Sequence, residues 1–372
     1  MRERHYRGKL AIQQRVLTTY RASFFDALAQ SCNGGLSICA GSPRPEESIA
    51  TTDSLRVARY TYTPNVHLFH GAYYFCFQKG LVKWLNECDP DALILEANPR
   101  YLSAPGAIRW MKRRSRPVLG WGLGAPSVSS PNGLARAWGQ FQRRFFLQRF
   151  DALITYSSRG ANEYRTLGFP GDKIFIAPNA AAPRPARPIP ARPAGFNGKP
   201  VVLFVGRLQA RKRVDLLLRA CAVLPEQLKP RLVIVGDGPE RESLQTLAKT
   251  IYPAAEFPGA KHGPDLAAYF AGADLFVLPG TGGLAVQEAM AYGLPVIMGE
   301  GDGTNVDLVR SGNGWQILSD DLAALTETLT AALSDPSRLR EMGAESFRIV
   351  KEEINLEKMA GVFVDALNKI SK

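Results

Sequence analysis

The 372-residue sequence is poor in the residues that build disulfides and metal centres. It holds five cysteines, an odd number without any Cys-x-x-Cys spacing, and four histidines. Scattered cysteines of this kind are typical of reduced thiols in a cytosolic protein and exclude a disulfide framework. His67 and His70 lie close together, but two loop histidines without further partners are a weak metal signal. We therefore expect no metal site.

Long apolar runs are also absent. No stretch reaches the roughly 18 uninterrupted apolar residues that a membrane-spanning helix needs. Residues 1–15 contain no apolar run long enough for a signal peptide. We therefore expect a cytoplasmic protein. Its length predicts about two domains, and its 45% hydrophobic content is enough for two ordinary cores.

Acidic residues are scarce in the first half of the chain, so the charge is unevenly distributed. Residues 1–195 hold 27 Lys and Arg against 12 Asp and Glu, a net charge of +15. The rest of the chain holds 19 basic and 22 acidic residues, a net charge of −3. This asymmetry predicts an anionic partner for the first half: a membrane surface, a phosphate-bearing acceptor or nucleic acid.

Short apolar segments alternate with helical segments through most of the chain, a pattern typical of parallel sheets in α/β domains. We expect buried strands at residues 9–13, 36–40, 91–96, 117–122, 151–156, 201–205, 231–235 and 275–278, and a further strand that starts at residues 296–297. Residues 181–200 are rich in Pro, Ala and Arg and cannot form a regular helix. They indicate a semi-rigid linker between a domain at 1–180 and a domain at 201–355. Residues 356–372 are expected to form a last helix.

Residues 275–297, LFVLPGTGGLAVQEAMAYGLPVI, combine a buried strand, a glycine turn and a helix start. Gly280, Gly282 and Gly283 allow a tight turn whose N–H groups face a ligand. Because the positive end of the helix dipole points at this turn, the segment predicts an anion site. Glu288 lies in the early part of the helix, where a carboxylate can accept hydrogen bonds from vicinal hydroxyls. The simpler alternative is a carboxylate that only complements the helix dipole.

The same stretch resembles the nucleotide-sugar signature of the retaining glycosyltransferases of family 4, which have the GT-B fold. The matching residues are Gly283, Leu284, Glu288, Ala289, Met290, Ala291, Gly293, Pro295 and Val296. The resemblance implies that Glu288 holds the ribose hydroxyls and that the turn with Gly282, Gly283 and Leu284 binds the donor. The family's first glutamate, which contacts the donor sugar, falls on Gly280 and is missing.

A second segment resembles the diphosphate site of the same family. Gly206, Arg207 and Lys212 match its pattern, while Arg213 stands where the family has glycine. The resemblance implies that Arg207 and Lys212 are the two catalytic cations. A departing nucleoside diphosphate gains charge as the glycosidic bond breaks, and fixed cations stabilise that charge most in the transition state. Lys261 lies in EFPGAK, which resembles the stretch where backbone groups grip the base.

The first 150 residues fit the family's architecture without a strong motif of their own. Position alone, at or near the carboxyl ends of expected strands, nominates Glu96 as a catalytic residue and Tyr20, Arg21 and Trp121 as acceptor-side residues. Each has a structural alternative: Arg21 as a surface charge, Tyr20 and Trp121 as packing residues, and Glu96 as a loop carboxylate.

Residues 135–150, ARAWGQFQRRFFLQRF, predict a basic helix with Trp138, Phe141, Phe145 and Leu147 at roughly helical spacing. Its arginines are Arg136, Arg143, Arg144 and Arg149. Such a helix is the expected form of a surface that lies on anionic lipid. The alternative is a helix whose aromatic side chains pack on the sheet, and the charge of the first half favours the membrane. No nucleic-acid-binding motif accompanies the charge, so we expect no nucleic acid partner.

These observations predict two Rossmann-like domains facing a cleft, with the donor on the second domain, the acceptor on the first and the last helix crossing back onto the first. The resemblance implies transfer of a sugar from a UDP- or GDP-sugar, with retention and without a metal or other cofactor. The basic first half predicts a lipid-linked or envelope saccharide as acceptor, at the inner face of the plasma membrane.

Two other functions fit the same residues. With Gly280 in place of the family's glutamate, the chain can be a nucleotide-sugar-binding partner protein without transfer activity. A nucleotide-sugar epimerase on a similar fold is a third interpretation, which the transfer motifs disfavour. The sequence leaves the sugar, the base and the linkage open.

Overall fold

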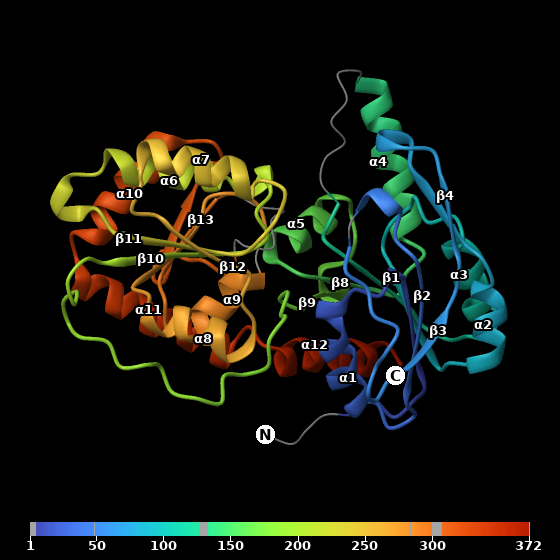
Figure 1. The fold of residues 1–372 in the computed structure, drawn as a ribbon. Coiled ribbons are helices and arrows are strands. Elements are labelled where there is room, and N and C mark those ends of the chain that lie inside the picture. Colours follow the sequence, from blue (N-terminus) through green and yellow to red (C-terminus); the bar gives the residue numbers. More distant parts are fainter. Residues whose placement is uncertain (1–4, 48, 126–132, 283, 300–306, 372) are drawn as a thin grey trace. The chain divides into compact units, whose positions relative to one another are not determined.

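The computed structural model describes residues 5–47, 49–125, 133–282, 284–299 and 307–371 (Figure 1). The chain divides into two compact units. Met1–Pro183 and Leu356–Lys372 form the first unit, and Arg184–Asn355 form the second. Within the described ranges, no helix is both long and apolar enough to cross a membrane.

The first unit is built on a seven-stranded sheet in the order β3-β2-β1-β6-β7-β8-β9, in which all neighbours are parallel. Its strands are β1 (Leu10–Val16), β2 (Leu36–Gly41), β3 (Arg59–Tyr62), β6 (Ala92–Glu96), β7 (Val118–Gly122), β8 (Ala152–Thr155) and β9 (Ile174–Ile176). Most residues of the central strands are buried whichever face they point to. This pattern is typical of a parallel sheet covered by helices on both sides.

Two helical layers cover this sheet. The helices of the first unit are α1 (Ala22–Gln30), α2 (Leu81–Cys88), α3 (Ala104–Lys112), α4 (Gly133–Leu147), α5 (Ser158–Thr166) and α12 (Leu356–Ile370). Leu10 and Ile12 of β1 belong to a core shared with α1 and α12, whereas Ala11 belongs to the core shared with α2 and α3. Successive residues of a strand point to opposite faces, so one strand supplies both cores.

The last helix, α12, packs against α1 within the first unit. The ring centroid of Phe363 lies 5.0 Å from that of Phe24 and 4.9 Å from that of Trp121. All three side chains are nearly fully buried. The prediction that the last helix returns to the N-terminal domain is therefore confirmed.

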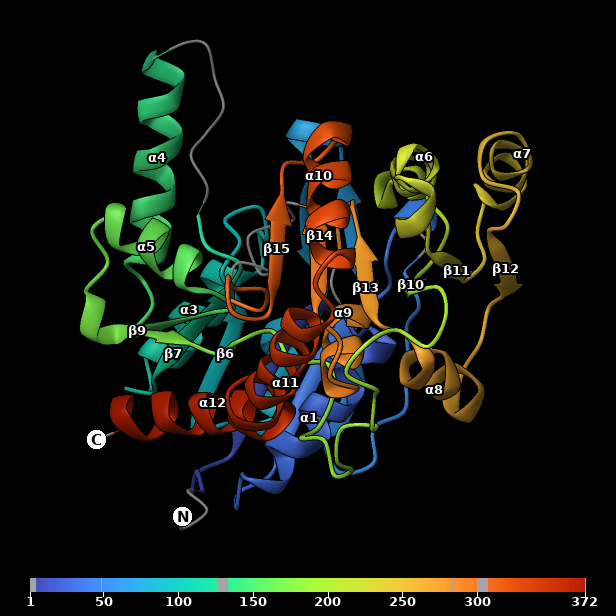
Figure 2. The ribbon, with the colours of Figure 1, turned by 90° about the vertical axis from the view of Figure 1, so that its left-hand side faces the viewer.

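The second unit holds a six-stranded parallel sheet in the order β12-β11-β10-β13-β14-β15. Its strands are β10 (Val201–Val205), β11 (Arg231–Val235), β12 (Glu256–Gly259), β13 (Leu275–Leu278), β14 (Val296–Gly299) and β15 (Gly314–Ile317). Its helices are α6 (Val214–Val223), α7 (Arg241–Ile251), α8 (Gly263–Gly272), α9 (Leu284–Ala291), α10 (Leu322–Leu333) and α11 (Pro336–Glu352). Figure 2 shows α6, α7 and α10 on one face of the sheet and α8, α9 and α11 on the other. The predicted class, two Rossmann-like α/β domains, is confirmed.

Most of the predicted linker, 181–200, is part of the second unit. The guanidinium of Arg192 donates hydrogen bonds to the carbonyl oxygens of Ala273, Tyr292 and Phe270 at 2.8, 2.8 and 3.0 Å. These bonds hold the proline-rich segment against α8 and the end of α9. Burial, and then the neighbouring Arg340, lower the pKa of Arg192 to about 10.

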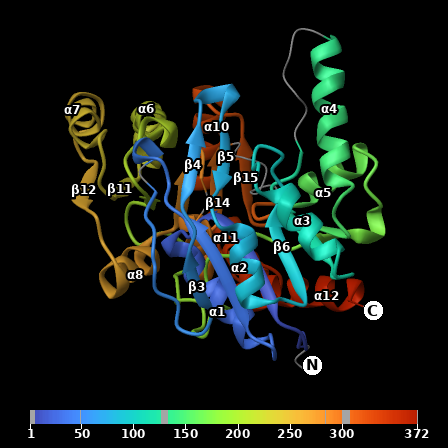
Figure 3. The same cartoon turned by 90° about the vertical axis from the view of Figure 1, so that its right-hand side faces the viewer.

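A small antiparallel hairpin, β4 (Asn65–Leu68) and β5 (Phe75–Gln78), belongs to the first unit and was not predicted (Figure 3). Its residues do not alternate cleanly between buried and exposed. The hairpin therefore lacks the period-2 pattern by which a strand is recognised in a sequence. The first residue of β4, Asn65, and the last residue of β5, Gln78, both donate side-chain hydrogen bonds to carbonyl groups of β1.

Candidate functional site

The strongest candidate site lies in the second unit, where two loops meet beyond the sheet. One loop follows β10 and ends in the turn Ala210–Lys212, and the other is the glycine turn between β13 and α9. The backbone N–H of Thr281 donates to the carbonyl of Arg211 at 3.0 Å. The Arg211 guanidinium also donates to the Thr281 hydroxyl at 3.3 Å. Neither Thr281 nor Arg211 was singled out from the sequence, because their pairing is a tertiary contact.

Lys212 is the cation that the structure places most firmly at this turn. Its Nζ donates to the carbonyl of Thr281 at 2.6 Å and lies directly beside Gly282. Gly282 has a φ of +114°, and any Cβ at this position would overlap the Lys212 amine. The left-handed backbone conformation therefore favours glycine, and a side chain there would also displace the flexible end of Lys212.

Burial, and then the charge of Arg211, lower the pKa of Lys212 to about 8. A desolvated amine loses the water that would stabilise its charge, and a second cation nearby raises the electrostatic cost further. The site therefore holds a positive charge that an incoming anion would stabilise. This is the electrostatic condition for binding a diphosphate.

Gly280, where the family pattern has a glutamate, has no room for a side chain. A Cβ there would overlap the Arg211 carbonyl oxygen and come within 2.7 Å of the Lys212 Cα. Both obstacles are backbone atoms, so they cannot swing aside. The turn that carries Arg211 and Lys212 fills the space beside Gly280. This packing explains why glycine stands at the position where the family pattern has glutamate.

The remaining donor-site candidates all lie in the second unit. Arg207 is exposed just beyond β10, and Gly206 and Lys261 are half-buried. Leu284 is exposed at the start of α9, while Glu288 is half-buried one turn later, and burial raises the pKa of its carboxyl. Gly283 falls outside the described residues.

Arg213 adopts the left-handed conformation, with φ of +54°, at the position where the family has glycine. Its guanidinium bonds to both carboxylate oxygens of Asp215, at 3.1 and 3.2 Å, and pairs with Asp320. A non-glycine residue rarely adopts this conformation. The ion pairs at the start of α6 occupy this third cation with carboxylates, which leaves Lys212 and Arg207 for a ligand.

In the first unit, Glu96 ends β6 and lies against the end of β1. Its Oε1 accepts a hydrogen bond from the backbone N–H of Arg15 at 3.1 Å. Burial raises the pKa of Glu96, while its contacts with Arg15 and Tyr101 act in the opposite direction. Its catalytic role stays a prediction.

The three predicted acceptor-side residues have different surroundings. Trp121 is 2% exposed and packs in the core, as the structural alternative describes. Arg21 is 5% exposed, not a surface charge, and its guanidinium donates to Asn179 Oδ1 at 2.6 Å. That guanidinium also stacks over the rings of Tyr20, Trp121 and Tyr156. Tyr20, 43% exposed, is the one of the three that can still reach a ligand.

The described residues include no cluster of three or more His, Cys, Asp or Glu side chains placed to hold an ion. The sequence does contain one Asp-x-Asp pair, Asp89 and Asp91, just before β6. Asp89 pairs with Arg116, and Asp91 accepts the backbone N–H of Lys9 at 2.7 Å. Both carboxylates are engaged in contacts within the protein.

Helix α4 carries a surface that the packing alternative does not explain. Trp138, Phe141 and Phe145 are 62%, 60% and 55% exposed, and the first two rings stack with centroids 5.9 Å apart. Of the predicted apolar positions, only Leu147 packs in the core. Figure 1 shows the helix extending away from the sheet of the first unit. The Arg149 guanidinium lies over the Phe145 ring, 4.7 Å from its centroid.

The other arginines of this helix differ in exposure. Arg144 is exposed and Arg143 is half-buried, and burial, and then Arg100, lower the pKa of Arg143. The side chain of Arg136 falls outside what the structure describes. The helix therefore presents exposed aromatic rings next to cationic side chains, as the membrane hypothesis requires.

Two doubly wound parallel sheets, with a cationic glycine turn beyond the second, place the chain in the class of two-domain Rossmann-like α/β proteins, and comparison with known proteins identifies the family. Residues 36–184 match the model described as Glycosyltransferase Family 4, and residues 188–348 match the model described as Glycosyl transferases group 1. The chain therefore belongs to this family of glycosyltransferase enzymes.

Among similar curated proteins, a GDP-mannose-dependent alpha-mannosyltransferase of Mycolicibacterium smegmatis is 47% identical over 168 residues, 42% of each chain. A protein of the same description from Corynebacterium glutamicum is 42% identical over 161 residues, 42% of this chain and 36% of that protein. The matches thus span less than half the length of these relatives.

Solved structures resemble the whole chain in fold. The lipopolysaccharide outer core galactosyltransferase WaaB has a TM-score of 0.68 at 16% identity, covering 97% of this chain and 99% of that one. Anabaena Alr3699/HepE in complex with UDP has a TM-score of 0.68 at 15% identity, with the same coverage. Both likenesses support the GT-B architecture.

We expect Gly280→Ala to destabilise the second unit by about 1–3 kcal/mol, because the new methyl group overlaps fixed backbone atoms. Urea unfolding measures the change. Gly272→Ala at the end of α8 is the control, because a Cβ there meets nothing within 4 Å, and it should stay within about 0.5 kcal/mol of the parent protein. Equal unfolding midpoints for the two variants would contradict the steric argument.

We expect the affinity for a nucleoside diphosphate to fall as pH rises above about 8, the value to which burial lowers the pKa of Lys212. The free protein then loses the charge of this amine, whereas bound diphosphate favours the charged form. The dissociation constant should increase by up to about tenfold per pH unit above that point. Calorimetric titration between pH 7 and 9.5 measures it.

The matched variant for this titration is Lys212→Arg, whose guanidinium stays protonated throughout the range. Its affinity, whatever its absolute value, should be nearly independent of pH. A slope equal to that of the parent protein would show that another group causes the pH dependence.

Proposed function

We propose that this protein transfers a hexosyl group from a nucleotide-diphosphate sugar to a saccharide acceptor. The observation that carries this proposal is the Lys212 amine, held at the glycine turn between β13 and α9 by the Thr281 carbonyl. A half-buried cation with a lowered pKa, at a glycine turn that leads into a helix start, fits a diphosphate.

In this mechanism the second unit stabilises the leaving group. As the bond between the sugar and the diphosphate breaks, negative charge grows on the phosphate oxygens. Arg207 offers a planar guanidinium and Lys212 a point charge to those oxygens. These two cations take the part that a metal ion plays in other transferases, so we propose transfer without a metal and, as in the family pattern, with retention. Glu288 accepts hydrogen bonds from the ribose hydroxyls.

The proposed donor base and sugar are those named in the descriptions of the relatives. The descriptions of several similar curated proteins name GDP-mannose as the donor. One similar protein is described as acting on a phosphatidylinositol monomannoside, a lipid-linked saccharide. We therefore propose GDP-mannose as the first donor to test and a lipid-linked saccharide as the acceptor class.

An acceptor with a lipid anchor places the reaction at a membrane surface. The exposed rings of Trp138, Phe141 and Phe145 and the nearby arginines of α4 supply apolar area and positive charge on one helix. Both contribute to the binding of an interfacial helix to anionic lipid. We place the protein on the inner, cytoplasmic face of the membrane, held there by α4.

A panel of GDP-, UDP- and ADP-sugars, read by thermal shift and by release of the nucleoside diphosphate, tests the donor assignment. Glu288→Gln should weaken binding of the true donor about tenfold to a hundredfold, because it removes charge-assisted hydrogen bonds. Glu242→Gln, an exposed glutamate in the first turn of α7, is the matched control and should bind normally.

The results also separate transfer from the alternative of a binding protein without activity, which the absent side chain at Gly280 keeps open. Donor binding without any release of nucleoside diphosphate, on any lipid extract, would favour the binding role. If no nucleotide sugar binds, or if Glu288→Gln and Glu242→Gln behave alike, the proposed donor site is wrong.

The membrane proposal is tested by sedimentation with vesicles that contain anionic phospholipid. Replacing Arg143, Arg144 and Arg149 with Glu should abolish binding, and replacing Trp138, Phe141 and Phe145 with Ala should weaken it at least tenfold. The control is Arg219→Glu with Lys249→Glu, two exposed cations of the second unit, which should bind as the parent protein does. Binding that survives both α4 variants would reject the role of this helix.

A further inference from the structure

The base of the β4–β5 hairpin brings two carboxamides together at the end of β1. Asn65 and Gln78 are directly paired across the hairpin. Asn65 Nδ2 donates to the carbonyls of Arg15 and Ser42 at 2.7 and 2.9 Å, and Gln78 Nε2 donates to the carbonyl of Gln14 at 3.1 Å. A carbonyl can only accept a hydrogen bond, so these contacts fix which end of each amide is nitrogen and which is oxygen.

The oxygens of the same two amides are left without a partner. Among the described residues, neither Asn65 Oδ1 nor Gln78 Oε1 has a hydrogen-bond donor, and both atoms are shielded from solvent. Gln78 is only 4% exposed. An unpaired buried acceptor costs free energy, so two on neighbouring strands call for an explanation.

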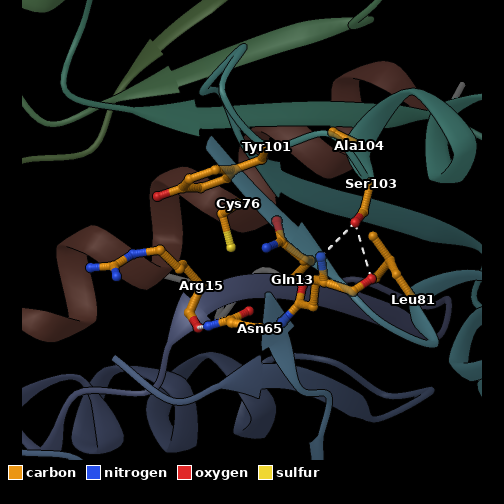
Figure 4. A pocket seen from close by; sticks show the side chains of 9 residues that line it. Gln13, Arg15, Asn65, Cys76, Leu81, Tyr101, Ser103 and Ala104 are labelled. Carbon is orange, nitrogen blue, oxygen red and sulfur yellow. Dashed lines mark hydrogen bonds between the residues drawn. The ribbon is translucent and has the colours of Figure 1, made fainter. Parts of the chain in front are cut away.

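Both residues line one small pocket, shown in Figure 4. Its other polar lining residues are Gln13, Arg15, Cys76, Tyr101 and Ser103. Its free volume is about 10 Å³, which is room for about one water-sized group. The pocket therefore accepts a single small polar group at a time.

The chemistry of the lining determines which group fits. Arg15 is engaged by Glu47 at 2.7 Å, and the Ser103 hydroxyl is used twice by the backbone of Gln78. The Tyr101 hydroxyl hydrogen-bonds to Glu96. The two unpaired amide oxygens need a donor. A hydroxyl supplies one, whereas an ionised phosphate or carboxylate oxygen has no hydrogen to donate.

We infer that this pocket receives one hydroxyl group of the acceptor saccharide, with water in its place when the acceptor is absent. The pocket lies at the carboxyl end of β1, the end of the strands at which open α/β sheets bind their ligands. Glu96, whose Oε1 is bonded to the Arg15 N–H, lies next to the same strand end. The inference rests on the proposed function, because it assigns to the first unit the part of the acceptor that carries free hydroxyls.

The test uses simple methyl glycosides as probes: methyl α-D-mannopyranoside and its four monodeoxy analogues, each lacking one hydroxyl, titrated into the full chain by ligand-observed NMR. One analogue should bind about tenfold more weakly than the parent glycoside, since a deoxy sugar leaves the amide oxygens unpaired. Inorganic phosphate should not displace the glycoside. Equal affinities for all analogues, or no binding of any glycoside, would overturn the inference.

Gln78→Met removes the unpaired oxygen and should erase the discrimination between the glycoside and that analogue. The control is Thr63→Val, which removes the hydroxyl of another buried residue that does not line this pocket. It should discriminate as the parent protein does. Discrimination that persists in Gln78→Met, or that is equally lost in Thr63→Val, would overturn the inference.

A third variant covers the case in which Gln78→Met fails to fold, because its amide also bonds to β1. Ala104→Val, at the first residue of α3, adds two methyl groups to the pocket lining without touching a hydrogen bond, and should abolish glycoside binding. Unchanged binding by this folded variant would overturn the inference. Nucleotide-sugar binding, measured separately, should be unaffected in all three variants. If the parent protein binds no nucleotide sugar, the proposed function is rejected, whereas the inference about this pocket is judged by the glycoside titrations alone.

Discussion

The proposed donor site depends on one close approach between two backbone segments. The turn Ala210–Lys212 packs against the glycine turn after β13 so tightly that Gly280 has no space for a side chain, and Gly282 lies directly beside the Lys212 amine. This contact places the Lys212 amine against the Thr281 carbonyl and removes it from bulk water. This arrangement explains why the pKa of Lys212 is lowered and why no glutamate fits at position 280. Arg213, the next residue in the chain, has a left-handed backbone conformation.

The positive charges of this protein lie in four different settings. Lys212 is half-buried at the glycine turn, while Arg213 is neutralised by Asp215 and Asp320. Arg192 and Arg21 are built into the structure, the first through backbone carbonyls and the second through Asn179 and aromatic rings. The arginines of α4 lie beside exposed aromatic rings. The net charge of the sequence therefore indicates an anionic partner only once the structure shows which cations are exposed and which are paired within the protein.

The two units differ in how much of their site a sequence motif records. In the second unit the proposed donor site is built from backbone turns, which require glycine at fixed positions and so leave a readable pattern. In the first unit the polar groups near the end of β1 come from β1, the β4–β5 hairpin, β6 and the start of α3. Ordinary residues such as Asn65, Gln78 and Ser103 perform this task, so no motif identifies them.

The sequence by itself determined the alternation of strands and helices, the two Rossmann-like domains, the return of the last helix and the glycine turn, because periodicity and glycine placement are local properties. It did not reveal the hairpin, whose strands are half-exposed. Only the tertiary structure decided that Trp121 is a core residue, that Arg21 is buried and that Gly280 faces the Arg211 backbone. Burial and close approach depend on segments far apart in the chain, and no local pattern encodes those distances.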